Sequence, residues 1–378
     1  MKMNRVQFQA GLSMPEFFDL YGTEAKCRQA LQAARWPNGF VCSGCGSEAR
    51  TSYERGGLRY WQCGGCQRQT SLISGTIFEA SKLPLLRWFL ALQLLSQSKN
   101  NVSALELKRQ LGVSYRSAWL MKHKILEAMR LAEDERRLDG RVEIDDAYLG
   151  GELSGGKSGR GSDNKVPFLA AVQTTAAGHP LYACLSAQPP TSQAMSGFAA
   201  RHLGASTVVV SDGLRCFMAV TQHGIEHQRI LLRPNQNGAA ACVKLPQFKA
   251  INTLLGNLKT AIAGTYHAFD FAKYAHRYLA EFQFRFNHRF NMKTIFHSLL
   301  VSLLATPASP ERWLRTAEVH RESGAHMVHL RVADQCLSHI VGLLNVVRGL
   351  TPDQVQAFGL LHHHGEVASV AGSAGPPL

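Results

Sequence analysis

The stretch that decides the fold is Val142-Glu143-Ile144-Asp145-Asp146-Ala147-Tyr148-Leu149-Gly150-Gly151. Its alternating apolar and acidic residues predict a β-strand with one buried face, and the glycine pair predicts a turn where the strand ends. Glu143 and Asp145 share one face of that strand, and Asp146 lies on the other. Mg²⁺ is one candidate counter-charge for these carboxylates, because hard cations prefer oxygen ligands. A surface strand with an acidic solvent face is the alternative interpretation of this stretch taken alone.

The composition indicates a folded protein with a polyanionic partner. The chain has 378 residues, which favours two or three domains, and its hydrophobic content of 45% is enough for real cores. Lys and Arg number 41 against 27 Asp and Glu, so the formal net charge is +14. Such an excess suggests nucleic acid first and an anionic membrane surface second. The sequence contains no apolar run of membrane-spanning length and no signal-peptide core, so we expect a cytoplasmic protein.

Two Cys-x-x-Cys pairs lie in the N-terminal part of the chain. Cys42 and Cys45 form the first pair, Cys63 and Cys66 form the second, and seventeen residues separate them. This spacing is typical of a zinc ribbon, in which two knuckles supply four thiolates to one structural zinc ion. A short β-hairpin is expected between the pairs. Redox-active pairs, or cysteines that merely pack, are the alternative.

A helix-turn-helix pattern follows the ribbon. Its first helix ends at Leu111, Gly112 makes the turn, and Ser114 caps the second helix. The start of such a second helix is where contacts with a DNA groove are made. The residues expected to contact DNA are Tyr115, Arg116, Ser117, Lys122 and Lys124. An ordinary helical hairpin is the alternative, and the neighbouring ribbon and the net charge favour DNA.

From Arg141 onward the pattern changes to strands with intervening helices. The β-branched run before Ser211-Asp212-Gly213 predicts a buried strand with a carboxylate at its C-terminal tip. In open α/β sheets such tips line the active cleft. A helix is expected over residues 246–263, where Asn252 and Lys259 share a face two turns apart.

Together these features resemble the DDE-type transposases of bacterial insertion sequences, in the group with an N-terminal zinc ribbon. The resemblance covers roughly residues 15–300. Its motifs are the cysteine ribbon, the stretch at 142–151, Val210-Ser211-Asp212-Gly213, Asn252 with Asn257-Leu258-Lys259, Gly264-Thr265-Tyr266-His267 and the segment at 278–289. It implies an α/β fold with a ribonuclease-H-like mixed sheet and flanking helices, preceded by a zinc ribbon and a helix-turn-helix.

The predicted organisation has five segments. They are a helical leader at 1–38, the zinc ribbon at 39–80, a helix-turn-helix DNA-binding domain at 81–135, a ribonuclease-H-like catalytic domain at 140–305 and a C-terminal extension of unknown role at 306–378.

The resemblance also implies an activity and roles for the site residues. Asp145 and Asp212 would bind two catalytic Mg²⁺ ions, Asn252 would take the third position, and Lys259 would contact DNA phosphate. Two-metal phosphoryl transfer would then cleave DNA strands and join them to a target. The implied partners are double-stranded DNA at the element ends and at the target, and a homodimer or larger assembly on that DNA, without a membrane. We therefore expect a nucleoid-associated protein.

Asn252 departs from a full acidic triad because its amide oxygen carries no charge. Glu281 is the nearby acid that could substitute, although Arg277 and Arg285, one helical turn away on either side, offer it salt bridges. Three alternative functions remain open at this point. They are a zinc-ribbon regulator that binds DNA without catalysis, a nuclease of the same fold without strand transfer, and a catalytically degenerate transposase copy.

Overall fold

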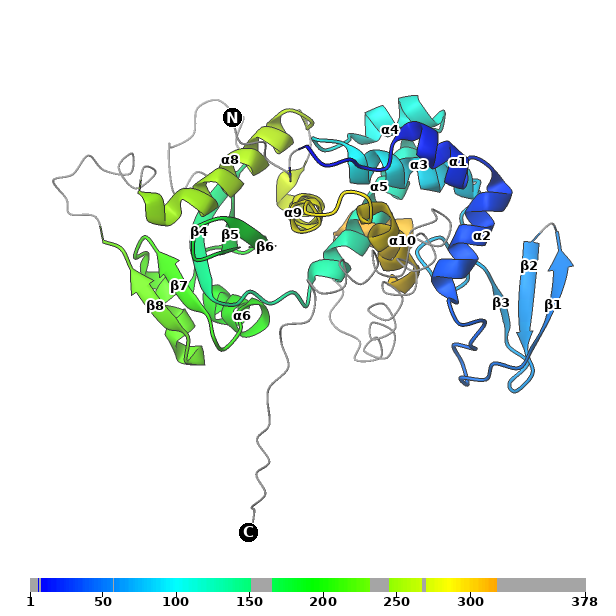
Figure 1. Cartoon of the computed structure of the whole chain (residues 1–378), viewed down its shortest axis with the longest axis horizontal. Coiled ribbons are helices and arrows are strands. Elements are labelled where there is room, and N and C mark those ends of the chain that lie inside the picture. Colours follow the sequence, from blue (N-terminus) through cyan, green and yellow to red (C-terminus); the bar gives the residue numbers. More distant parts are fainter. Residues whose placement is uncertain are drawn as a thin grey trace, which may run out of the picture. The chain divides into compact units, whose positions relative to one another are not determined.

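A mixed sheet organises the α/β part of the computed structural model, which describes residues 6, 8–56, 58–150, 165–231, 245–266 and 270–317. Its strands are β4 (Arg141–Leu149), β5 (Val166–Thr174), β6 (Pro180–Ser186), β7 (Val208–Ser211) and β8 (Glu226–Arg229). Their order is β6-β5-β4-β7-β8; β4, β5 and β6 pair antiparallel, whereas β7 runs parallel to β4 and β8 parallel to β7. The predicted α/β class with a mixed sheet is confirmed, and the acidic strand β4 lies at its centre (Figure 1).

Helices cover both faces of this sheet. On one face, α8 (Lys249–Ala263) and α9 (Phe271–Asn287) share a core with Ala147 of β4. On the other face, α6 (Ser192–His202) and a 3₁₀ segment, η1 (Arg215–His223), pack with Ile144. Because side chains alternate along a strand, the face of β4 that carries Asp145 is the one covered by α8.

The N-terminal helices share the core of α8 and α9. They are α1 (Met14–Tyr21), α2 (Glu24–Arg35), α3 (Leu85–Gln97), α4 (Ala104–Leu111) and α5 (Tyr115–Glu133), and α10 (Ile295–Ala305) packs with them. Gly112, at φ +61°, ends α4, and the Ser114 side chain caps α5, so the predicted helix–turn–helix geometry is present. Since one core runs through α3–α5 and onto the sheet, the 81–135 segment does not pack as an independent unit.

Helix α5 lies along α9, and buried ion pairs join them. Arg277 Nε donates to Glu127 Oε2 at 2.9 Å, and Lys122 Nζ lies 3.5 Å from Glu281 Oε2. The predicted salt bridges from Arg277 and Arg285 to Glu281 are therefore replaced. Both helices bury charged side chains against each other, so Glu127 pairs with Arg277 across the contact as well as with Arg130 along α5.

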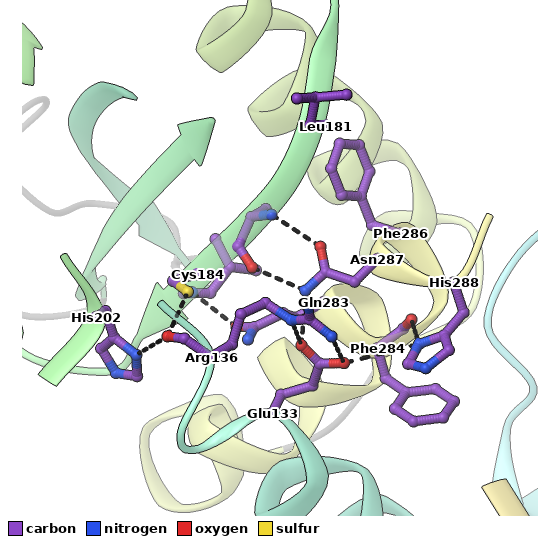
Figure 2. A network of polar contacts seen from close by, with 12 residues as sticks. Glu133, Arg136, Leu181, Cys184, His202, Gln283, Phe284, Phe286, Asn287 and His288 are labelled. Atoms are coloured by element: carbon purple, nitrogen blue, oxygen red, sulfur yellow. Dashed lines mark hydrogen bonds and ion pairs between the residues drawn. The ribbon is translucent and has the colours of Figure 1, made fainter. Parts of the chain in front are cut away.

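The C-terminal end of α9 is fixed to the edge of the sheet. Figure 2 shows Asn287 between Glu133 of α5 and the β6 backbone. Asn287 accepts from Ala183 N at 2.8 Å and donates to Ala183 O at 2.9 Å, and one turn earlier Gln283 accepts from Leu185 N at 2.7 Å. These amides occupy backbone groups of an edge strand that would otherwise lack a neighbour.

The ribbon forms a small sheet of β1 (Arg50–Arg55), β2 (Leu58–Cys63) and β3 (Gln69–Ser71). The expected hairpin is present as β1–β2, and β3 adds a third antiparallel strand. Among the described residues, no helix has the length and apolar character needed to cross a membrane. The segments 151–164 and 232–244, and most of the predicted 306–378 extension, lie outside the described residues.

Candidate active site

The register between β4 and β7 places the two candidate aspartates on neighbouring segments of the sheet. The strands run parallel, and the last pair is Glu143 opposite Val210. Two residues beyond that pair are Asp145, within β4, and Asp212, directly after β7 ends. Neighbouring strands lie about 4.8 Å apart, so the backbones of the two candidate residues stand on adjacent segments at the C-terminal end of β7.

A tight turn holds Asp212 at the tip of β7. Its Oδ1 accepts a hydrogen bond from the Leu214 backbone N–H at 3.0 Å. Gly213 adopts φ +85°, and a Cβ there would lie 2.4 Å from Leu231 Cδ2. The exposed Leu231 side chain could move aside, so the positive φ is what favours glycine here and gives the Asp-Gly motif a structural reason.

The helix that carries Asn252 is anchored to β4 by a side chain. Glu143, which is buried, accepts from the Ile251 backbone N–H at 2.9 Å through Oε2 and from Arg141 Nη1 at 2.6 Å through Oε1. Arg141 Nη2 also donates to Gln247 O at 2.8 Å. Among the described residues, the N-cap of α8, Phe248, offers no side-chain hydrogen bond to the helix. The carboxylate of Glu143 takes this role and also complements the helix dipole.

The donor set suits a hard divalent cation. Asp145 and Asp212 offer carboxylate oxygens, and half-buried Asn252, next to the anchored Ile251, offers an amide oxygen. Glu281, the alternative third ligand, is fully buried, and its Oε2 accepts from the Tyr266 hydroxyl at 2.6 Å and pairs with Lys122. These interactions make Glu281 part of the α5–α9 contact, which leaves Asn252 as the third candidate.

Lys259 is exposed two turns after Asn252 on α8, and Asp146 is buried on the opposite face of β4 from Asp145. An exposed lysine on the same helix face as the candidate ligand can reach a phosphate bound beside the site. The placement of Asp146 agrees with the choice of Asp145 as the ligand.

The four ribbon cysteines form a metal-binding geometry. The ligand atoms of Cys42, Cys45, Cys63 and Cys66 all lie within 4.8 Å of one another, and all four thiols are free of disulfides. The Cys66 backbone N–H, which donates to Cys63 Sγ, lowers the pKa of the Cys63 thiol to about 6 and favours the thiolate. Four converging thiols of this kind fit a closed structural zinc site.

The first turn of α5 is accessible, as expected for a DNA-reading helix. Tyr115 is 53% exposed, Arg116 is exposed, and half-buried Ser117 donates its backbone N–H to Ser114 Oγ at 3.1 Å. Lys108 and Arg109 at the end of α4 are also exposed. This first turn and the end of α4, residues 108–116, are called the α4–α5 corner below.

Lys122 and Lys124 do not belong to that surface. Both are buried: Lys122 donates to Val102 O and to the Tyr266 hydroxyl, and Lys124 donates to Ile77 O at 2.7 Å. Burial lowers the pKa of both lysines. Their ammonium groups form hydrogen bonds inside the protein, which argues against the predicted contacts of these two lysines with DNA.

Sequence reasoning overlooked Glu143 and Arg141 as site residues. The signal was present, because Glu143 shares a strand face with Asp145. The hydrogen-bond partner of Glu143 could not be predicted, because it is a backbone N–H more than a hundred residues away in the sequence.

Comparison with known proteins adds two domain matches and one relative. Residues 137–287 match the ISXO2-like transposase domain, and residues 22–69 match the transposase zinc-ribbon domain. The chain is 29% identical over 213 residues to an "Uncharacterized protein in transposable element ISH50" of Halobacterium salinarum, an alignment that covers 52% of this chain and 69% of the relative. The first range contains Asp145, Asp212 and Asn252, and the second contains all four ribbon cysteines.

Proposed function

Because the chain belongs to the insertion-sequence transposases with an N-terminal zinc ribbon, we propose that it binds the terminal inverted repeats of its element and catalyses Mg²⁺-dependent strand cleavage and strand transfer. The β4–β7 register is the observation that carries this proposal. It supports the proposal because Asp145 and Asp212 follow paired positions of neighbouring strands, and because α8, the helix of Asn252, is hydrogen-bonded to β4.

In this proposal Asp145, Asp212 and Asn252 hold two Mg²⁺ ions. When bound, such ions activate the attacking oxygen and stabilise the leaving oxygen of an in-line displacement at phosphorus. The residues of the chain supply ligand geometry, and Lys259 contacts a phosphate near the scissile bond as a point charge. Water cuts the strand at the element end and frees a 3′-hydroxyl, and that hydroxyl then attacks target DNA.

The ribbon and the α4–α5 corner provide DNA recognition in this scheme. The net charge of +14 favours association with the phosphate backbone. Recombination at two element ends needs two active sites, so we infer at least a dimer on DNA. The protein would act at the nucleoid in the cytoplasm.

A nicking assay on DNA that carries the inverted repeats tests the proposal. Asp145→Ala and Asp212→Ala should each abolish Mg²⁺-dependent nicking and leave DNA binding intact, because neither change touches the ribbon or the α4–α5 corner. Asp146→Asn is the matched control and should retain most of the activity. Nicking that persists in Asp212→Ala would refute the assignment.

A second assay separates a transposase from a nuclease of the same fold. A pre-cut element end is supplied with a target plasmid, and joined products are measured. A protein that nicks the element end and never joins it is a nuclease. A protein that binds the end and neither nicks nor joins is a regulator or a degenerate copy.

A further inference from the structure

A short helix from the C-terminal extension contacts the residue predicted to read DNA. Helix α11 (Glu311–Thr316) packs against α5. Glu311 Oε2 accepts from Arg116 Nε at 2.9 Å and from Arg116 Nη2 at 2.8 Å. The Arg116 side chain is 76% exposed and that of Glu311 is 20% exposed. The carboxylate therefore holds the guanidinium from the protein side, and the rest of the guanidinium faces solvent.

Glu311 is itself held in place. Arg315 Nε donates to Glu311 Oε1 at 2.9 Å, and the Arg315 guanidinium lies 4.4 Å from the centre of the Trp119 ring. Hydrogen bonds from Arg116 and Arg315 lower the pKa of Glu311 and so favour its charged form. Glu311 thus pairs with Arg315 of its own helix, and Arg315 in turn lies over the Trp119 ring of α5.

The contact leaves one edge of the Arg116 guanidinium open. Glu311 uses the edge formed by Nε and Nη2. The edge formed by Nη1 and Nη2 carries a second pair of parallel donors, on a side chain that is 76% exposed. Paired arginine donors match O6 and N7 of guanine in the major groove. An arginine already held in one orientation also loses less side-chain entropy when it binds.

We propose that Glu311 orients Arg116 to read a guanine in the DNA at the element end. This inference rests on the proposed function and adds a specificity-determining pair to it. It also gives α11, at the start of the C-terminal extension, a role, since this helix packs against α5. The competing reading is that Glu311 masks Arg116 and must be displaced by phosphate.

The test is a selection of binding sites from a random double-stranded DNA library by the full-length, zinc-loaded protein. The variants are Arg116→Lys, which keeps the charge and loses the planar donors, and Glu311→Gln, which weakens the clamp. Arg312→Gln is the matched control, because Arg312 is exposed on the same helix and its loss changes general electrostatics. Binding of the enriched duplex is then compared with that of a duplex carrying 7-deazaguanine at the preferred position.

The wild type should prefer guanine at one position by roughly 5- to 150-fold, and 7-deazaguanine there should weaken binding. Arg116→Lys should lose this preference, Glu311→Gln should reduce it at the same position, and Arg312→Gln should keep it. Unchanged guanine preference in Glu311→Gln, tighter binding of that variant to all sequences, or no guanine preference in the wild type would each overturn the inference. The proposed function fails separately, in the nicking assay, whose result does not depend on which base is preferred.

Discussion

The carboxylate of Glu143 accepts a hydrogen bond from the backbone N–H of Ile251 at 2.9 Å. This bond joins the strand of Asp145 to the helix of Asn252, and it lies within two residues of each. The distance between these two candidate ligands therefore depends on the buried side chain of Glu143, which is not itself proposed as a metal ligand.

Replacement of Glu143 should disturb the site through α8. Glu143→Ala leaves the buried Ile251 N–H without its acceptor and removes one of the acceptors of Arg141. The change should lower the free energy of unfolding by about 1–3 kcal/mol and slow nicking more than tenfold. Glu143→Gln keeps an oxygen for Ile251 and should retain more activity. Nicking rates at saturating Mg²⁺ and urea unfolding measure both effects. Equal nicking by Ala and wild type would exclude the anchoring role.

A second prediction concerns the neutral third position. Asn252→Glu adds a carboxylate to a site with two aspartates, so the variant should reach half-maximal nicking at a lower Mg²⁺ concentration. A titration of nicking against Mg²⁺ measures this, with Asn257→Glu, exposed on the same helix, as control. If wild type is inactive and Asn252→Glu is active, this chain is a degenerate copy. A raised Mg²⁺ requirement in Asn252→Glu would remove residue 252 from the ligand set.

Zinc removal should unfold the ribbon and little else. One zinc ion per chain is expected, and chelation or Cys63→Ser should release it, since metal binding supplies the folding free energy of such small modules. Trp61 packs beside Cys63, so its fluorescence should change while most of the helical circular dichroism remains. Cys216→Ala, at a buried cysteine outside the ribbon, should keep the zinc. Full zinc content in Cys63→Ser would contradict the assignment.

Stability should fall as the pH decreases below the ordinary pKa of histidine. Burial, and then the charge of Arg277, lower the pKa of His123 to about 2, and burial lowers that of His276 to about 4. Below pH ~6.5 these histidines bind protons in the unfolded chain but stay neutral in the folded protein. The free energy of unfolding therefore falls by about 1.4 kcal/mol per pH unit for each ring.

The change is measured by urea unfolding between pH ~6.5 and ~5. His123→Phe keeps the ring against Trp119 and removes the titration, so its stability should depend less steeply on pH than that of the wild type. His179→Gln, at an exposed position, should match the wild type. Identical slopes for His123→Phe and wild type would mean that His123 does not contribute.

The elements around the site could be predicted because their signals are local. Alternation in β4, the β-branched run before Asp212 and the cap at Ser114 each act within a few residues. Residues 215–223 form a 3₁₀ segment and not an α-helix. Phe217, Val220 and Thr221 are weak helix formers, and no described side chain caps the start of the segment.

What escaped prediction depends on contacts distant in sequence. The sequence around Lys122 predicts a surface lysine, because its partners Tyr266 and Glu281 are far away in the sequence. Helix α10 has an apolar sequence typical of a buried helix, but its position in the fold is set by its packing against α3 and α5. Glu311 carries no local sign that it meets Arg116.

The amides of Gln283 and Asn287 also bear on how copies of this chain can associate. By occupying backbone groups of Ala183 and Leu185, they close one border of the sheet to strand addition from another molecule. The other border of this mixed sheet is β8, and strand addition from another molecule would have to occur there. Residues Glu226 to Arg229 of β8 are polar or charged, which makes β8 a poor template for pairing. Self-association by strand templating, including the kind that precedes fibre formation, is disfavoured at both ends of the sheet.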